Sequence, residues 1–286
     1  MHRTRAMHIV CAGHINWDVR LHVDRLPTPG DEGLIERRHE SGGGSAANVA
    51  VGLAELGEDA HLLGAAGDDE RGSEATARLE EAGVEPHVRI AEAPTTVKYV
   101  LVNGAGEVAL LGTDGANESF GADDLPAGTL DTAGALHLTG QRPETAAELA
   151  RRAPADAVVS FDPGRRGADR AYDAVFEHVD VLLVNEKEAQ TLDVDVPVTV
   201  TKLGAEGARW SGPAGVVESG GIDVGAVADT TGAGDAFAAG FLTVWLDERE
   251  PARALGVGNA CGALAVGEEG PDANLSWERI ESMLDR

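Results

Sequence analysis

Short apolar runs alternate with amphipathic stretches along most of the chain, and this alternation restricts the folds it can adopt. Buried strands are predicted at residues 7–12, 60–67, 135–140, 157–162, 180–185 and 196–204. Helices are predicted at residues 45–56, 70–82, 143–152, 168–178, 185–192, 233–246, 251–266 and 276–285. Strands that alternate with helices in this way form βαβ units, in which helices cover both faces of a mostly parallel sheet. The sequence therefore predicts a three-layer α/β fold.

Two segments interrupt the alternation. Residues 18–40 and 95–113 have the pattern of exposed β segments with turn residues such as LPTPGDEG and VNGAGEV. We expect them to form a small β-sheet lid over the edge of the main sheet, with lid segments at about 14–40 and 95–113. No repeat or linker divides the chain, so we predict one domain over residues 1–286.

The charge of the chain excludes several classes of function. Asp and Glu number 49 against 23 Lys and Arg, which gives a formal net charge of −26. Such a chain repels the nucleic-acid backbone and anionic lipid surfaces, so neither is an expected partner. No apolar stretch approaches the roughly 20 residues needed to span a bilayer, and the first residues do not resemble a signal peptide. With Cys11 and Cys261 expected to be reduced core residues, we predict a cytoplasmic protein.

The basic residues have an unusual composition. Only three of the 23 are Lys, at Lys98, Lys187 and Lys202. An acid excess with few lysines indicates a protein adapted to a salt-rich cytoplasm, where self-repulsion is screened. A GC-rich genome that favours Arg codons is the alternative, although it does not explain the carboxylates.

The segment DTTGAGDAFAAGFLTVWL, residues 229–246, is the most informative motif. Gly232, Ala233 and Gly234 directly precede or open a predicted helix, where unpaired backbone N–H groups bind anions and small residues allow close approach. Asp235 follows in the first turn, where it is placed to accept a proton from a hydroxyl that attacks a phosphoryl group. The alternative is a glycine-rich turn with an acid that interacts with the helix dipole.

A second glycine-rich segment, ESGGGSAANVAVGLAELG, spans residues 40–57. Gly42, Gly44 and Ala47 match the dinucleotide fingerprint GxGxxA. However, the preceding LIERRHE alternates like an exposed strand, whereas a buried strand precedes that fingerprint in a Rossmann unit. We therefore predict that Gly43 and Gly44 allow close approach of a polyol and that Asn48 hydrogen-bonds one of its hydroxyls.

These motifs together resemble those of the ribokinase-like (PfkB) family of carbohydrate and nucleoside kinases. The resemblance rests on Gly43, Gly44 and Asn48, on DTTGAGD at 229–235, on GHINWD with Asp18, and on the GAAGDDERG and ALAVGEEGPDANLSW segments. It covers nearly the whole chain and implies the ribokinase-like fold. It also implies that Asp18 binds the sugar, that Asp235 is the catalytic base, and that the amides of residues 232–234 bind the transferring phosphate. A carboxylate of ordinary basicity would suffice for such a base.

The resemblance also implies an ATP and metal site. Asn185 and Glu188 match the NxxE motif that organises Mg²⁺ through water, whereas a solvated helix position is the alternative for Glu188. Residues expected along the nucleotide are Thr201, Gly204, Gly207 and, near the adenine, Asn259. Residues matching positions around a monovalent cation, expected to be K⁺, are Asp229, Thr231 and Gly270. Lid strands of this family often pair between subunits, so a homodimer through the lid is expected.

Arginines near strand ends are the main indication of the substrate. Arg142, Arg165 and Arg166 follow predicted strands at the edge where α/β folds bind ligands. In so acidic a chain they indicate an anionic substrate or the ATP phosphates, and surface ion pairs are the alternative. Lys98 and Tyr99 in the lid are further candidates for substrate contact.

We therefore expect an ATP-dependent kinase that phosphorylates the primary hydroxyl of a ribose-type phosphosugar such as ribose 1-phosphate. A neutral substrate, for a ribokinase, nucleoside kinase or fructokinase, and the sugar acid 2-keto-3-deoxygluconate remain alternatives. A dinucleotide-dependent oxidoreductase would require an acidic residue at the end of the second strand, but the candidate, Asp68, lies beyond that strand in a turn.

Overall fold

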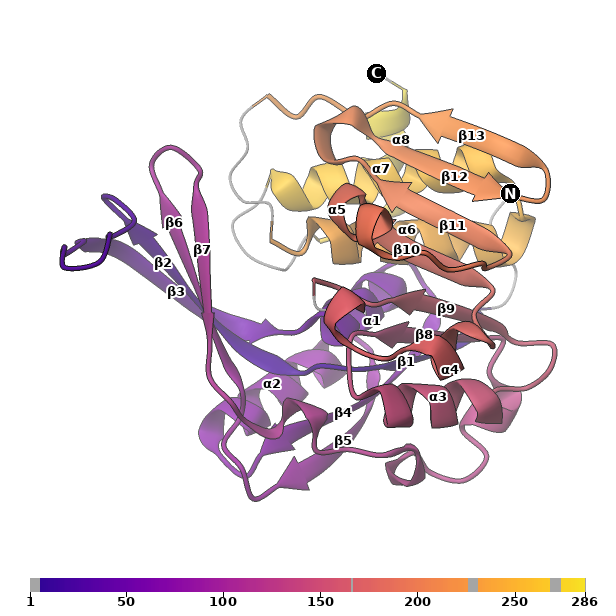
Figure 1. Ribbon diagram of the computed structural model, residues 1–286, viewed down its shortest axis with the longest axis horizontal. Helices are drawn as coiled ribbons and strands as arrows, with labels where there is room; N and C mark the ends of the chain where they lie inside the picture. Colours follow the sequence, from indigo (N-terminus) through magenta and orange to yellow (C-terminus); the bar gives the residue numbers. More distant parts are fainter. Residues whose placement is uncertain (1–5, 166, 226–230, 268–273, 286) are drawn as a thin grey trace.

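The computed structural model describes residues 6–165, 167–225, 231–267 and 274–285. Its nine-stranded sheet has the order β13-β12-β11-β10-β9-β8-β1-β4-β5 (Figure 1). The strands are β1 (His8–Ala12), β4 (Asp59–Gly67), β5 (Glu85–Ala91), β8 (Ala135–Thr139), β9 (Val158–Asp162), β10 (Val181–Asn185), β11 (Val198–Lys202), β12 (Ala208–Gly212) and β13 (Gly215–Ser219). All neighbours from β5 to β11 pair in parallel, and β12 and β13 add an antiparallel hairpin at one edge. This confirms the mostly parallel sheet.

Helices cover both faces of this sheet. The helices are α1 (Ser45–Glu55), α2 (Glu70–Glu81), α3 (Pro143–Arg152), α4 (Asp173–Phe176), α5 (Glu186–Thr191), α6 (Ala233–Glu248), α7 (Pro251–Val266) and α8 (Trp277–Leu284). Successive residues of β1 alternate between the two cores, because strand side chains point to opposite faces. Ile9 and Cys11 pack with α1, α2, α6, α7 and α8, whereas Val10 and Ala12 pack with α3 and α4. These two cores make the expected three layers.

A second sheet of four strands projects from this body (Figure 1). It consists of β2 (Asn16–Val23), β3 (Ile35–Gly43), β6 (Val97–Asn103) and β7 (Val108–Gly112) in the order β3-β2-β6-β7. β2 and β6 are parallel, and the other two pairs are antiparallel. The two predicted lid segments thus form one sheet. β2 is largely buried rather than exposed, because Trp17 and Val19 pack into the main core.

Some elements differ from those predicted. The helix expected over 168–178 is a 3₁₀ turn (Gly167–Asp169) and a short α4. Between them Tyr172 is buried against Phe161, and its hydroxyl donates to the Gln141 carbonyl at 2.6 Å, so tertiary packing interrupts the helix. β5, β12 and β13 were not predicted, because they lie at or next to a sheet edge and carry exposed or polar residues that obscure the apolar pattern. In the described part of the chain, no helix is long and apolar enough to cross a membrane.

Candidate active site

The start of α6 has the geometry of an anion site. Gly232 precedes the helix with φ 79°, a left-handed conformation that glycine adopts without strain. Ala233 and Gly234 open the helix, so their N–H groups have no acceptor within it. Residues 232–235 are half-buried rather than covered by packed side chains. Asp235 lies in the same turn as these amides.

Asp235 is tied to the second glycine-rich motif. Asn48 in α1 donates from Nδ2 to Asp235 Oδ2 at 2.9 Å, which joins residues far apart in sequence. Burial raises the pKa of Asp235 to about 7, and the charges of Asp162 and Asp18 add to the rise, whereas Asn48 and Lys202 oppose it. Asp235 is therefore less acidic than an ordinary aspartate, because burial and several converging carboxylates favour its protonated form.

A buried ion pair adds positive charge to the anion site. Lys202, at the end of β11, donates to Asp162 at the end of β9 over 2.6 Å. A Cβ on Gly234 would lie 3.4 Å from Lys202 Nζ, so the ammonium is next to the α6 amides. Burial alone would lower the pKa of Lys202, but the Asp162 carboxylate outweighs it and the pKa is raised, so the lysine stays charged. Sequence reasoning did not assign Lys202, although a rare lysine at a strand end was a usable signal.

Asn185 and Glu188 form a reciprocal cap at the start of α5. The Asn185 amide donates to Glu188 Oε2 at 2.9 Å, and the Glu188 amide donates to Asn185 Oδ1 at 2.9 Å. Glu188 is buried rather than solvated, and burial together with the charge of Asp162 raises its pKa. Its Oε1 accepts no hydrogen bond from a described residue.

This donor set suits Mg²⁺, which prefers oxygen ligands and retains water molecules. Glu188 and Asp162 are the carboxylates near the anion site. Within the described ranges, no group of three or more His, Cys, Asp or Glu residues could hold a metal ion by itself.

The residues expected along the nucleotide lie around the end of β11 and its hairpin. Thr201 is in β11, and Gly204 and Gly207 bound the turn that follows, with φ 62° and 100°. A Cβ on Gly207 would lie 2.1 Å from the Ser219 carbonyl oxygen, so only glycine fits there. Asn259 of α7 donates to the same Ser219 carbonyl at 3.2 Å, which brings it close to Gly207. Asn259 is thus buried and ties α7 to the hairpin, rather than lying on the helix surface.

The residues predicted to bind the sugar lie together where β2 and β3 pair. A Cβ on Gly43 would lie 2.4 Å from Asp18 Oδ2, so glycine makes room for the carboxylate. Gly44 has φ 107° and packs against the His14 carbonyl. α1 starts directly after Gly44 and presents Asn48 to Asp235. The structure therefore brings Asp18, Gly43, Gly44, Asn48 and Asp235 into one region.

The lid residues Lys98 and Tyr99 point to opposite faces of the small sheet. Lys98 is in register with Asp18 and shares its face, whereas Tyr99 is in register with Val19 and packs against the main core. The two side chains therefore do not face one substrate group together.

The remaining predicted residues are placed less closely. Arg165 is exposed after β9, and Arg142 is exposed at the start of α3, where its Nη2 donates to the Phe120 carbonyl at 2.7 Å. Thr231 lies in the turn before α6. Three predicted residues lie outside the described residues: Arg166, Asp229 and Gly270.

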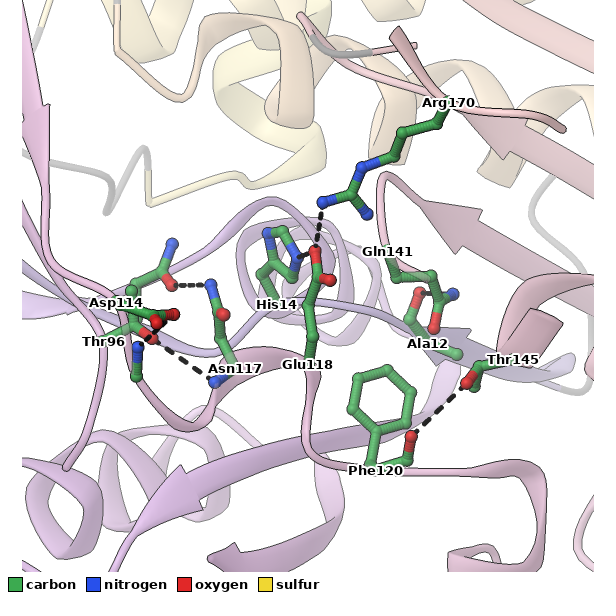
Figure 2. A network of polar contacts seen from close by, with 12 residues as sticks. Ala12, His14, Thr96, Asp114, Asn117, Glu118, Phe120, Gln141, Thr145 and Arg170 are labelled. Atoms are coloured by element: carbon green, nitrogen blue, oxygen red, sulfur yellow. Dashed lines mark hydrogen bonds and ion pairs between the residues drawn. The ribbon is translucent and has the colours of Figure 1, made fainter. Parts of the chain in front are cut away.

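Figure 2 shows a polar network, around Glu118, that the sequence did not reveal. Glu118 accepts from Arg170 at 2.7 Å through Oε1, and His14 Nε2 lies 3.0 Å from the same oxygen. Next to it, Asn117 donates to Asn16 Oδ1 at 3.0 Å, at the start of β2. The segments that carry these residues are distant in sequence, and only the fold brings them together.

Known proteins share this architecture. Residues 6–278 match the family described as pfkB family carbohydrate kinase. The chain is 48% identical to the ATP-dependent ribose-1-phosphate kinase of Halopiger xanaduensis, over 96% of this chain and 97% of that protein. It is 30% identical to the 2-dehydro-3-deoxygluconokinase of Thermoproteus tenax, over 88% of this chain and 87% of that protein.

Solved structures agree in fold. The ribokinase of Thermotoga maritima superposes with a TM-score of 0.86 at 25% identity, covering 98% of this chain and all of that one (100%). The nucleoside kinase of Methanocaldococcus jannaschii gives a TM-score of 0.85 at 24% identity, with 98% and 99% covered. The ribokinase-like fold inferred from the motifs is thereby confirmed, and this chain belongs to the pfkB family of carbohydrate kinases.

Proposed function

We propose that this kinase transfers the γ-phosphate of ATP to the primary hydroxyl of ribose 1-phosphate. The observation that carries the proposal is the joined site of Asp235, Asn48 and the α6 amides, next to Lys202. The identity to the ribose-1-phosphate kinase of H. xanaduensis supports the choice of substrate. The site geometry supports a kinase, and the similarity to this relative supports a phosphosugar as its substrate.

The chemistry follows from this arrangement. Asp235 accepts the proton of the primary hydroxyl while the hydroxyl oxygen forms a bond to the γ-phosphorus. The bond between the γ-phosphorus and the β,γ-bridging oxygen breaks, which releases ADP. The amides of residues 232–234 and the Lys202 ammonium stabilise charge on the transferring phosphoryl group. Mg²⁺, when bound, supplies further charge neutralisation at the phosphates. Glu188 and Asp162 would hold it through water.

Other parts of the proposal rest on fewer observations. Asp18, Gly43 and Gly44 bind the sugar. Candidates for binding the phosphate of the sugar or those of ATP are Lys98, Arg142, Arg165 and Arg166. The residues that line the nucleotide are Thr201, Gly204, Gly207 and Asn259. A K⁺ ion held near Thr231 by Asp229 and Gly270 follows from the family motif. A cytoplasmic location is consistent with the reduced, buried Cys11 and Cys261.

A homodimer through the lid has support in surface composition. The outer strands of the small sheet and the turn before β3 expose large apolar side chains, namely Leu34 (68%), Ile35 (53%), Leu110 (42%) and Leu111 (61%). Apolar side chains gathered on projecting strands are typical of an interface. Sedimentation of the protein and of a Leu111→Asp variant tests this: a dimer that becomes a monomer supports it, and two monomers refute it.

Release of ADP tests the proposed substrate. The purified enzyme is assayed in concentrated KCl against ribose 1-phosphate, ribose, fructose, 2-keto-3-deoxygluconate and nucleosides. We expect the highest kcat/KM with ribose 1-phosphate. A higher kcat/KM with a neutral sugar, a nucleoside or the sugar acid would assign the enzyme to that substrate class and overturn the proposal.

A further inference from the structure

Among the described residues, two of the groups of ion pairs are sheltered from solvent. One is Lys202 with Asp162, whose side chains are 15% and 13% exposed. The other joins Arg170 and His14 to Glu118, with side chains 17%, 23% and 25% exposed. Sheltered ion pairs cost desolvation energy and contribute little net stability, so they are expected where function needs the charges. Phosphoryl transfer uses the first group, and no step described above uses the second.

Both groups lie at the carboxyl ends of the parallel strands. His14 follows β1, Arg170 follows β9, and Glu118 ends the 3₁₀ turn Ala116–Glu118 that leads from the small sheet back to the body. Figure 2 shows the Glu118 carboxylate between His14 and Arg170. This edge is where α/β folds bind their ligands.

The second group adjoins the residues predicted to bind the sugar but not the surroundings of Asp235. A Cβ on Gly44 would lie 2.3 Å from the His14 carbonyl oxygen, and the Asn117–Asn16 bond is two residues from Asp18. The charged groups that shift the pKa of Asp235 are Asp162, Lys202 and Asp18. Those that shift the pKa of Glu118 are His14 and Arg170. The charged residues around Asp235 and those around Glu118 are thus two separate groups, and the second adjoins the end of β2 that carries Asp18.

Arg170 retains capacity to bind an anion. A guanidinium has five N–H donors, and among the described residues Arg170 makes one hydrogen bond to Glu118 and one contact with the Tyr172 hydroxyl. The hydrogen bonds of His14 and Arg170 lower the pKa of Glu118 to about 2, so this carboxylate stays ionised and holds the guanidinium in place. A fixed, sheltered guanidinium suits a phosphate, which it binds through two parallel N–H bonds.

We propose that Arg170 binds the phosphate already present on the sugar substrate, distant from the hydroxyl that is phosphorylated. Glu118 positions Arg170 for this contact. The inference rests on the proposed function, because it requires a substrate that carries a phosphate, which a neutral sugar, a nucleoside or a sugar acid does not. In ribose 1-phosphate the phosphate and the primary hydroxyl lie at opposite sides of the ring. The substrate would thus extend from Asp235, past Asp18, to Arg170.

Variants of Arg170 test the proposal with two acceptors, ribose 1-phosphate and ribose, at saturating ATP and Mg²⁺. For Arg170→Gln we expect kcat/KM with ribose 1-phosphate to fall roughly 10- to 100-fold, mainly through KM, the effect of one lost charged hydrogen-bonding group. With ribose, kcat/KM should change by less than about threefold, because only the phosphate contact is lost. Arg170→Lys should recover part of the loss, since it keeps the charge without the planar fork.

Arg89→Gln is the matched control, because it removes the same charge and breaks a 2.8 Å ion pair to Asp124 at an exposed position of β5. This variant should leave kcat/KM with ribose 1-phosphate and with ribose unchanged. Thermal unfolding without ATP is a second measurement: ribose 1-phosphate should raise the melting temperature of the wild type and of Arg89→Gln but not of Arg170→Gln. If Arg170→Gln does not fold, Arg170→Lys decides, and an unchanged KM for ribose 1-phosphate would overturn the proposal.

The outcomes separate this inference from the proposed function. A wild type that phosphorylates ribose but not ribose 1-phosphate contradicts the proposed function. A wild type active on ribose 1-phosphate, with Arg170→Gln losing both acceptors equally or neither, contradicts only the role of Arg170. A selective loss of ribose 1-phosphate activity in Arg142→Gln instead would place the phosphate at the start of α3 and also overturn it.

Discussion

At the scale of single residues, opposing interactions act on the pKa of Asp235. Burial and neighbouring carboxylates favour its protonated form, whereas Asn48 and Lys202 favour the ionised form that a general base needs. A pKa near the working pH makes a base effective, since it is then both ionised and basic. The residues that shift the pKa of this carboxylate come from β2, β9, β11 and α1, so the shift depends on the assembled fold.

Replacing the base should separate catalysis from binding. For Asp235→Asn we expect kcat to fall by about 10²- to 10⁴-fold, the usual contribution of a general base. The Kd for sugar, measured by calorimetry, should stay nearly unchanged because the amide has the same shape. Asp173→Asn is a matched control, since Asp173 also lies in the first turn of a helix, α4, but at an exposed position. Unchanged turnover with weakened sugar binding in Asp235→Asn would contradict the assignment.

The pH profile should report the same carboxylate. The raised pKa of Asp235, about 7, means that kcat/KM falls as pH decreases through about 7, where the base becomes protonated. Asn48→Ala removes a hydrogen bond to the ionised form, so the pKa should rise and the acid limb should move to higher pH. The measurement is kcat/KM of both proteins between about pH 5 and 9, a range that brackets the acid limb. Identical acid limbs would exclude Asp235 as the titrating group.

At the scale of elements, the site depends on helix starts and a strand junction. α6 presents its amides and α5 its capped Glu188, while the β2–β3 pair places Asp18 beside the start of α1. At the strand junction, one added carbon atom on Gly43 or Gly44 would lie too close to neighbouring atoms.

Gly43→Ala tests the strand junction. The new Cβ would lie 2.4 Å from Asp18 Oδ2, so the carboxylate must move. We expect the KM for sugar to rise roughly 10-fold or more, as for a lost charged hydrogen bond, with the KM for ATP little changed. Gly104→Ala is the control, because Gly104 is in the β6–β7 turn with nothing within 4 Å of the added atom. Equal effects of both substitutions would show that Gly43 has no special role.

At the scale of the whole molecule, the charge of −26 dominates behaviour in solution. Exposed carboxylates repel one another, and the repulsion weakens as salt shortens the Debye length from about 10 Å at 0.1 M to about 3 Å at 1 M. Most ion pairs on the surface are too exposed to offset this repulsion, as Arg209–Glu218 (46% and 60%) illustrates.

Thermal unfolding should therefore depend strongly on salt. We expect the melting temperature to rise between about 0.1 M and 1 M KCl, with each kcal/mol gained worth about 2–4 °C in a chain of this size. NaCl at equal concentration should raise it similarly, since screening depends on ionic strength. Activity, in contrast, should be higher in KCl if the proposed K⁺ site exists. A melting temperature independent of salt would refute the role of self-repulsion.

Much of the fold could be predicted because local patterns determine it. Apolar runs identified β1, β4, β8, β9, β10 and β11, and periodicity identified seven of the eight predicted helices with small differences at their ends. The exception, the interrupted helix before α4, depends on packing of Tyr172 that no local pattern records. β12 and β13 pair with each other as a hairpin, and β12 joins the main sheet only through β11.

The sequence by itself determined the glycine-rich helix starts, the candidate base Asp235 and the family motifs, because these depend on residues adjacent in the chain. Only the tertiary structure decided which distant groups meet. It set the pKa of Asp235 through Asp162 and Lys202, and it assembled Arg170, Glu118 and His14 beside the sugar residues. The physical reason is that electrostatic and hydrogen-bonding interactions act over a few ångströms in space, whatever the separation of the residues in sequence.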